Sequence, residues 1–140
     1  MAPGARNPTV VIADDDALIR FVLRAALERS GYSVVDADDG ESAVRLCRTE
    51  AVDAVILDTR MPGLTLPETF TALRSDRADL PILILSGQSD PPDEAREPHT
   101  QFLSKPVDSR ALIETVARLV GVGTEWPAKR SGRSSRRADS

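Results

Sequence analysis

Short apolar runs alternate with longer amphipathic segments along this chain, and the alternation predicts strands separated by helices. Runs this short, with few or no polar positions inside them, are typical of strands buried on both faces of a parallel sheet. A fifth, more alternating strand is expected at 32–37. The four clear runs and the polar residues that follow them are Val10–Ala13 before Asp14, Ala54–Leu57 before Asp58, Ile82–Leu85 before Ser86, and Gln101–Ser104 before Lys105.

Apolar residues at three- and four-residue spacing predict helices at 17–29, 41–49, about 66–74 and 109–120. We expect Asp16 and Asp108 to cap the first and the last of these helices. The sequence Thr65-Leu66-Pro67-Glu68 matches a capping box with proline in the first turn and predicts the start of the third helix. In the first helix, the positions with core spacing are Leu18, Phe21, Val22, Ala25 and Ala26.

One segment, 88–100, interrupts the pattern because its three prolines leave room for at most two helical turns. The strand-helix alternation around it still implies an α/β fold, with a parallel sheet covered by helices on both faces. We expect residues 1–8 to form a loose leader, residues 9–121 the folded domain, and residues 122–140 a disordered basic tail. Removing residues 124–140 should therefore leave folding unchanged.

Composition places the chain among ordinary soluble globular proteins, because 41% of its 140 residues are apolar and 29% are charged. That length allows one domain with a hydrophobic core. No apolar stretch is long enough to span a membrane, and the N-terminus lacks the apolar core of a signal peptide. The single cysteine, Cys47, cannot form an internal disulfide, so we expect a reducing cytoplasm and a small buried helix residue.

Charge is divided unevenly between the body of the chain and its end. Residues 121–140 hold five basic and two acidic side chains, net +3, and the whole chain is −4, which leaves −7 for residues 1–120. An acidic body argues against a nucleic-acid-binding face on the folded part. Lys105 is the one lysine of the predicted domain, where all other cationic side chains are arginine. The lone histidine, His99, lies in a proline-bounded loop, and we interpret it as exposed and incidental.

The polar residues after the strands are expected to meet, because ligands of parallel α/β sheets bind beyond the carboxyl ends of the strands. Like charges at about 4 Å repel by roughly 4 kcal/mol at an effective dielectric of 20, so Asp14, Asp15 and Asp58 would need a cation between them. With Lys105 the cluster carries −2, which one divalent cation neutralises, and all-oxygen ligands favour Mg²⁺ or Mn²⁺. A carboxylate beside Mg²⁺ can attack phosphorus and form an acyl phosphate. Lys105 and Ser86 would then be drawn to the phosphoryl oxygens, which is the start of a switch.

Four sequence pieces together resemble the receiver domain of two-component response regulators, the CheY-like group, over roughly residues 9–121. The resemblance implies a doubly wound five-stranded parallel sheet with flavodoxin-like strand order 2-1-3-4-5. It also implies a cytoplasmic signalling protein that is not an enzyme beyond assisting its own phosphorylation and autodephosphorylation. The pieces are Val-Ile-Ala-Asp14-Asp15-Asp, Leu-Asp58-Thr-Arg-Met61-Pro62-Gly63, Leu-Ser86-Gly87 and Leu-Ser-Lys105-Pro106.

The resemblance also implies roles for single residues. Asp58 would accept the phosphoryl group. Asp15 and Asp58 would bind Mg²⁺ directly and Asp14 through water, together with the backbone carbonyl of Arg60. Lys105 would contact the phosphoryl group and would be joined to Pro106 by the family's cis peptide bond. The other expected phosphoryl contacts are Ser86 and the backbone N–H of Gly87.

The aromatic switch position of the family is occupied by Phe102. An ordinary strand side chain is the alternative interpretation of this residue, because phenylalanine cannot hydrogen-bond outward as tyrosine does.

The chain departs from the family at two places. Thr65-Leu66 replaces the Asp-Gly that often follows the Met-Pro-Gly turn, and Leu66 lacks the backbone freedom of glycine. Lys105 comes only 19 positions after Ser86, so the fourth helix of the family is expected to be short or missing. Partners of the family commonly dock on the face that this helix forms with the fifth strand and fifth helix, and we expect that face to be altered. The shortened region is similar to receivers of hybrid sensor kinases.

Four functions follow as alternatives. The first is a stand-alone receiver that takes a phosphoryl group from a histidine kinase or histidine phosphotransfer protein and switches a surface for an unknown effector protein. It would act as a monomer or a phosphorylation-dependent dimer, and the short segment after residue 121 argues against direct transcription control.

The second is a phosphate sink or a receiver detached from a hybrid kinase. A Mg²⁺-dependent phosphatase of the haloacid-dehalogenase type is weaker, because Arg60 stands where that family has its second Asp. A pseudo-receiver that switches without phosphate is weaker too, because every site position is filled.

Overall fold

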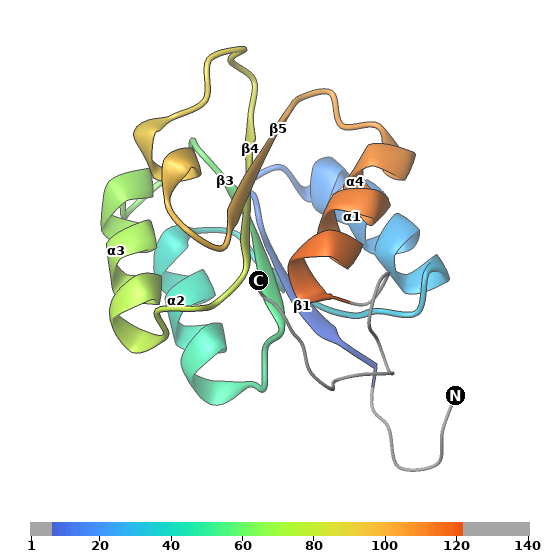
Figure 1. Ribbon diagram of the computed structural model, residues 1–140, viewed down its shortest axis with the longest axis horizontal. Coiled ribbons are helices and arrows are strands. Elements are labelled where there is room, and N and C mark those ends of the chain that lie inside the picture. Colours follow the sequence, from blue (N-terminus) through green and yellow to red (C-terminus); the bar gives the residue numbers. More distant parts are fainter. Residues whose placement is uncertain (1–6, 122–140) are drawn as a thin grey trace.

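Five parallel strands form one sheet in the computed structural model, which describes residues 7–121 of the chain. Their order is β2-β1-β3-β4-β5, so the predicted α/β fold with flavodoxin-like topology is confirmed (Figure 1). Every residue of β3 and β4 is buried, as expected for strands with neighbours on both sides and helices on both faces. The strands are β1 (Thr9–Ala13), β2 (Ser33–Ala37), β3 (Ala54–Asp58), β4 (Ile82–Ser86) and β5 (Thr100–Ser104).

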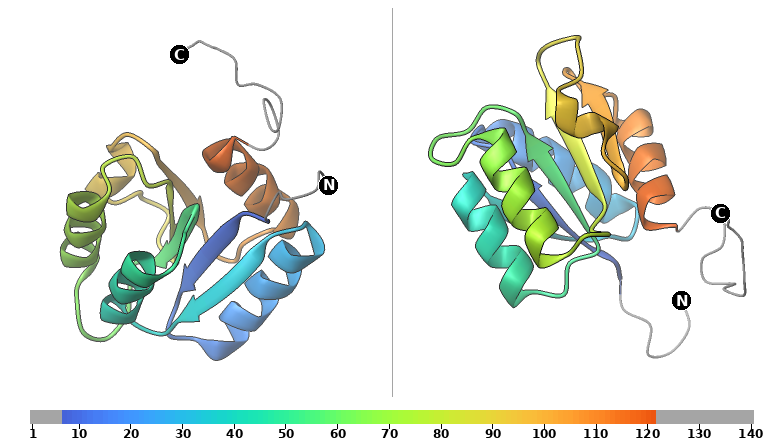
Figure 2. Two further views of the ribbon diagram at one scale, coloured as in Figure 1. Left: turned by 90° about the horizontal axis from the view of Figure 1, so that it is seen from below. Right: turned by 60° about the vertical axis from the view of Figure 1, so that its left-hand side comes forward.

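Four α-helices of the described chain cover the two faces of the sheet (Figure 2). One face packs on α1 and α4 around Leu27, Ile56 and Leu112, and the other packs on α2 and α3 around Leu57 and Leu73. Each face therefore has its own hydrophobic core, and the sheet separates the two cores. The helices are α1 (Ala17–Arg29), α2 (Gly40–Thr49), α3 (Leu66–Asp76) and α4 (Ser109–Val120).

The predicted helix caps are confirmed. The Asp16 carboxylate accepts hydrogen bonds from the first turn of α1, and the Asp108 carboxylate does the same for α4. Thr65 and Glu68 exchange side-chain and backbone hydrogen bonds in a complete capping box at the start of α3. These caps fix where the helices begin, and so they also fix the length of the loops that follow β1, β3 and β5.

The buried face of α1 differs from the prediction. Of the positions expected to be in the core, Leu18, Phe21 and Val22 are 69%, 68% and 50% exposed, whereas Leu23 and Leu27 are buried. The helix is apolar on two sides, and three-and-four spacing fits either side. The side with Leu23 and Leu27 faces the sheet, and in this orientation Arg20 and Arg24 of α1 both reach Asp36 on β2. The predicted Ala26 is buried and Ala25 is partly buried.

The proline-rich segment between β4 and β5 forms only one short 3₁₀ helix, η1 (Asp93–Arg96), so the expected loss of a full helix here is confirmed. The end of this segment is held by Arg74 of α3. Its guanidinium donates hydrogen bonds to the carbonyls of Leu80, Pro98 and His99 and to the Thr100 hydroxyl. The same guanidinium lies 5.1 Å from the centroid of the Phe70 ring. The start of β5 is thereby attached to α3.

Cys47 is half-buried on α2 against the core, and burial raises the pKa of its thiol to about 11. This agrees with a packing residue and not with a reactive thiol. Within the described residues, no helix combines the length and the apolar character needed to cross a membrane. The expectations for leader residues 1–6 and for the tail, residues 122–140, lie outside the described part of the chain.

Candidate functional site

Three carboxylates meet at the carboxyl ends of β1 and β3. Asp14, Asp15 and Asp58 each offer an oxygen, and these oxygens all lie within 4.8 Å of one another. Asp14 and Asp58 are 1% and 5% exposed, whereas Asp15 is open to solvent. The predicted convergence of these residues is therefore present. Two buried acids and one accessible acid form a cup of oxygen ligands with an entry path, which suits Mg²⁺ or Mn²⁺.

The ammonium group of Lys105 lies between two of the carboxylates. Its Nζ atom is 3.1 Å from Asp14 Oδ2 and 3.0 Å from Asp58 Oδ1. Lys105 follows β5, and its side chain reaches past the end of β4 to β3 and β1. The Lys105-Pro106 peptide bond is cis, as expected. The lysine partly neutralises the acids, and it holds the position from which it could contact a group added to Asp58.

Burial and charge act in opposite directions on this group of residues. Burial raises the pKa of Asp58; the hydrogen bond from Lys105 lowers it, and repulsion from Asp14 raises it further, so the pKa lies above its ordinary value. Burial would lower the pKa of Lys105, but its hydrogen bonds to Asp58 and Asp14 outweigh burial and raise it. The lysine stays charged, and the cluster retains a net negative charge that favours a divalent cation.

Asp14 is fixed from three directions. The Asp16 N–H donates to Asp14 Oδ1 at 2.9 Å, and Lys105 holds the other carboxylate oxygen. Arg20 donates from Nη1 to the Asp14 backbone carbonyl at 2.6 Å. Arg20 was not among the residues predicted for the site. The available signal was an arginine at the fourth position of a helix that starts directly after Asp14-Asp15-Asp16.

Ser86, at the end of β4, is 3% exposed and belongs to a pair of hydroxyls. Its Oγ accepts a hydrogen bond from the Gln88 N–H at 3.1 Å and another from the Thr59 hydroxyl at 3.3 Å. Thr59 was not among the predicted site residues. Gly87 is exposed next to Ser86, and a Cβ atom there would meet nothing within 4 Å.

The two remaining predicted residues lie at the edges of the site. Arg60 is exposed, and its backbone N–H hydrogen-bonds the Asp58 carboxylate. Phe102 is partly buried on β5 and packs against the core on the α2–α3 side of the sheet. An open hollow of about 660 Å³ lies beside Asp15 and is lined by Thr59, Arg60 and the turn around Pro62. This hollow gives solvent access to the carboxylate cup.

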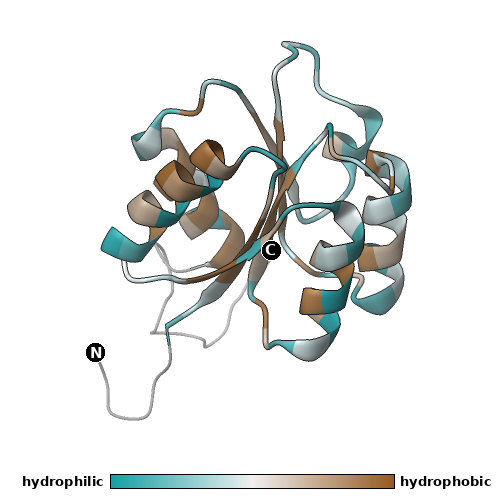
Figure 3. Cartoon of the chain, turned by 180° about the vertical axis from the view of Figure 1, so that it is seen from behind, coloured by the Kyte–Doolittle hydropathy of each residue, from teal (hydrophilic) through white to brown (hydrophobic). Residues whose placement is uncertain are grey.

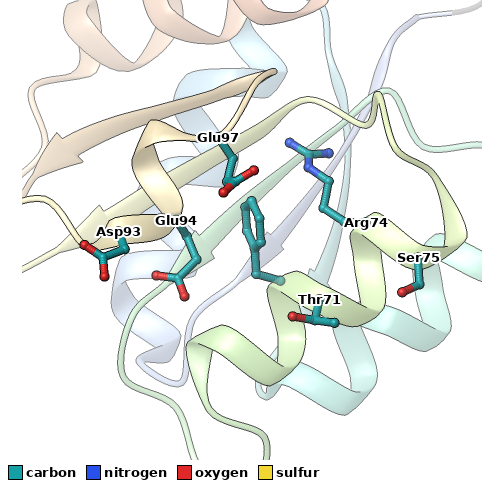
Figure 4. Close-up of a pocket in the computed structure, with 7 residues that line it drawn as sticks. Thr71, Arg74, Ser75, Asp93, Glu94 and Glu97 are labelled. Carbon is teal, nitrogen blue, oxygen red and sulfur yellow. The ribbon is translucent and has the colours of Figure 1, made fainter.

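Another hollow, between α3 and η1, shares no residue with the carboxylate cup (Figure 4). It is acidic on the η1 side, and the cation that lines it, Arg74, already donates to the carbonyls that hold the start of β5. Its lining residues are Phe70, Thr71, Arg74, Ser75, Asp93, Glu94 and Glu97.

Comparison with known proteins gives a consistent result. The family model for the response regulator receiver domain matches residues 10–117. Protein PilH of Pseudomonas aeruginosa is 31% identical over 112 residues, which cover 76% of this chain and 93% of PilH. The transcriptional regulatory protein PrrA of Mycobacterium tuberculosis is 34% identical over 122 residues, or 85% of this chain, but the match spans only 51% of PrrA.

Solved structures agree with these sequence matches. The receiver domain of the Francisella response regulator 1452 superposes with a TM-score of 0.75 at 29% identity, covering 82% of this chain and 98% of that one.

Proposed function

The chain belongs to the response regulator receiver domain family, and we propose that it accepts a phosphoryl group on Asp58 from a histidine kinase or histidine phosphotransfer protein. The observation that carries the proposal is the arrangement of three carboxylate oxygens within 4.8 Å, with Lys105 hydrogen-bonded to Asp14 and Asp58. An acyl phosphate at this position would change the charge that Lys105 and Ser86 face, and so switch a protein-binding surface.

The proposed transfer is an in-line displacement. A bond forms between an Asp58 carboxylate oxygen and phosphorus, and the bond from phosphorus to the donor imidazole nitrogen breaks, with the electron pair left on nitrogen. Mg²⁺, when held by Asp14, Asp15, Asp58 and the Arg60 carbonyl, would supply positive charge to the transferring oxygens. Lys105 already hydrogen-bonds Asp58, so it is positioned to neutralise the added charge, and exposed Gly87 would offer its backbone N–H beside Ser86.

The test is incubation of the chain with Mg²⁺ and acetyl phosphate, followed by intact-mass measurement. We expect the wild-type protein to gain one phosphoryl group that hydroxylamine removes, and Asp58→Asn to gain none. Asp79→Asn is the matched control, because Asp79 is exposed on the loop before β4, away from the carboxylate cup. The proposal fails if the wild type remains unmodified, or if Asp58→Asn is modified as fully as the control.

We further propose that the phosphodonor docks on the exposed side of α1. A donor that brings its imidazole to Asp58 must contact the rim of the cup. Part of that rim is an apolar hollow of about 450 Å³ that Lys105 lines together with Leu18, Val22, Pro106 and Val107. The layer formed by α1 and α4 carries much of the hydrophobic colour in Figure 3. Exposed apolar side chains next to a reactive site are typical of an interaction surface, and a helical donor surface fits a helix face.

A phosphate sink is the second candidate, because the segment between β4 and β5 has only η1 where the family commonly has a full helix for effector binding. Pull-downs with beryllofluoride-treated and untreated protein separate the two candidates. An effector retained only in the treated state favours a switch, whereas phosphotransfer without any state-dependent partner favours a sink.

A further inference from the structure

Thr59 directly follows the proposed phosphoacceptor and lies beside the end of the next strand. Its backbone N–H donates to the Leu85 carbonyl at 3.1 Å, which continues the β3–β4 ladder by one residue. Its hydroxyl donates to Ser86 Oγ at 3.3 Å. The backbone contact places Thr59 next to Ser86, so the hydroxyl pair follows from the strand register.

The hydrogen bonds of Ser86 leave one defined group free. A hydroxyl oxygen can accept two hydrogen bonds, and Ser86 Oγ accepts from the Gln88 N–H and from Thr59. The remaining group is its own hydrogen, which is what a phosphoryl oxygen would require. Among the described residues, Thr59 is the side chain that donates to Ser86, whereas Gln88 contributes only its backbone.

We propose that Thr59 is a positioning residue that holds Ser86 in the observed position and so opposes its movement toward a phosphoryl group on Asp58. This inference rests on the proposed function of Asp58. If Ser86 turns toward the phosphoryl group, its contact with Thr59 is lost. Thr59 is partly exposed and lines the open hollow beside Asp15, where water can replace the lost partner. The expected effect is therefore that of one ordinary hydrogen bond.

The test is the dissociation constant of beryllofluoride, a phosphoryl mimic, measured by titration calorimetry on the full chain in saturating Mg²⁺. Thr59→Val keeps the shape of the side chain and removes the hydroxyl, and should bind beryllofluoride about 2- to 10-fold more tightly than wild type. Thr59→Ser keeps the hydroxyl and should bind within about twofold of wild type. The Mg²⁺ dissociation constant without beryllofluoride should be the same in all three proteins.

A second measurement reports on Ser86 itself. In the metal-free protein, the Hα–Hβ scalar couplings of Ser86 should indicate one rotamer in wild type and Thr59→Ser, and a mixture in Thr59→Val. If Thr59→Val does not fold, Thr59→Ala serves for both measurements.

Equal or weaker beryllofluoride binding by the hydroxyl-free variant overturns the inference, and weaker binding would mean that Thr59 itself contacts the phosphoryl group. Failure of the wild type to bind beryllofluoride would instead reject the proposed function of Asp58, so the two failures are distinguishable.

Discussion

Lys105 Nζ donates to Asp58 Oδ1 at 3.0 Å although Lys105 follows β5 and Asp58 ends β3, and these two strands are not neighbours. β4 lies between them, and Lys105 also reaches Asp14 at the end of β1. One side chain from the edge strand therefore spans the ends of β4, β3 and β1. The main positive charge of the site therefore comes from the end of β5, the strand farthest in the sheet from β1 and its acidic pair.

Replacing Lys105 should destabilise the metal-free protein, because Asp14 and Asp58 would lose their shared cation. We expect Lys105→Met to lower the free energy of unfolding by about 1–3 kcal/mol without Mg²⁺. The loss should shrink in saturating Mg²⁺, because the bound cation takes over the neutralising role. Urea denaturation with and without Mg²⁺ measures both values. An equal loss in the two conditions would contradict a charge-based role, and Lys105→Arg controls for retained charge.

The raised pKa of Asp58 predicts a pH dependence with a defined sign. A carboxyl group whose pKa is higher in the folded state favours folding when protonated, so its stabilising contribution is complete below the ordinary pKa of 3.8 and is lost as pH rises through the folded value. In metal-free buffer at neutral pH, Asp58→Asn should therefore be more stable than wild type by about 0.5–2 kcal/mol. The difference should shrink as the pH falls through the folded pKa. A constant difference from neutral pH down to pH 3.8 would argue against this cause.

The error on α1 shows where sequence patterns stop being sufficient. Leu18, Phe21 and Val22 have core spacing, and so do Leu23 and Leu27 on another side of the same helix. Periodicity detects an apolar face but cannot choose between two of them. The choice depends on contacts with other elements, such as the packing of Leu27 against the sheet and the ion pairs to Asp36 on β2, and such long-range contacts are not encoded in local spacing. The caps were predicted correctly because every atom involved lies within one turn.

Substitutions on the two sides of α1 should separate folding from docking. Leu27→Ala removes a fully buried side chain and should cost about 2–5 kcal/mol of stability. Val22→Ser, on the exposed side, should change stability by less than about 0.5 kcal/mol. With a phosphorylated protein donor, we expect Val22→Ser to slow transfer to Asp58, because the substitution removes apolar surface that the donor would contact.

Acetyl phosphate provides the control for this prediction. It needs no docking surface, so Val22→Ser and wild type should react with it at the same rate. Equal slowing with both donors would place the effect on the carboxylate cup and not on docking.

Arg74 should stabilise the start of β5 against local unfolding. Lysine cannot reproduce the planar set of donors that Arg74 directs at several carbonyls, so Arg74→Lys should destabilise the protein by about 1–3 kcal/mol. Amide hydrogen exchange should accelerate most at Ile82 and Thr100 and least in β1. Arg110→Lys, on the exposed side of α4, is the matched control. Uniform acceleration across the sheet would contradict a local role for Arg74.

The sequence predicts those site residues that directly follow a strand. It does not predict contacts that depend on how neighbouring strands are aligned. Asp14, Asp58 and Lys105 each follow an apolar run, and a parallel sheet brings such positions to one edge. Thr59 also follows β3, but a threonine carries no charge that would identify it. Its pairing with Ser86 requires knowing that β3 and β4 are neighbours in a particular register. Arg20 contacts a backbone carbonyl, so its position near the start of a helix after the acidic residues was the only signal that the sequence offered.

β5 is attached at both of its ends, and this limits how it can respond to a change at the cup. Arg74 holds its beginning to α3, and Lys105, one residue past its end, is bound to Asp14 and Asp58. Five residues of strand span about 16 Å, so β5 is a short extended segment that is hydrogen-bonded to other elements at each end. With both ends held, we expect a phosphoryl group on Asp58 to shift β5 little along its own axis. We expect the response to appear instead as rotation of side chains such as Phe102, or as bending of the 87–99 connection.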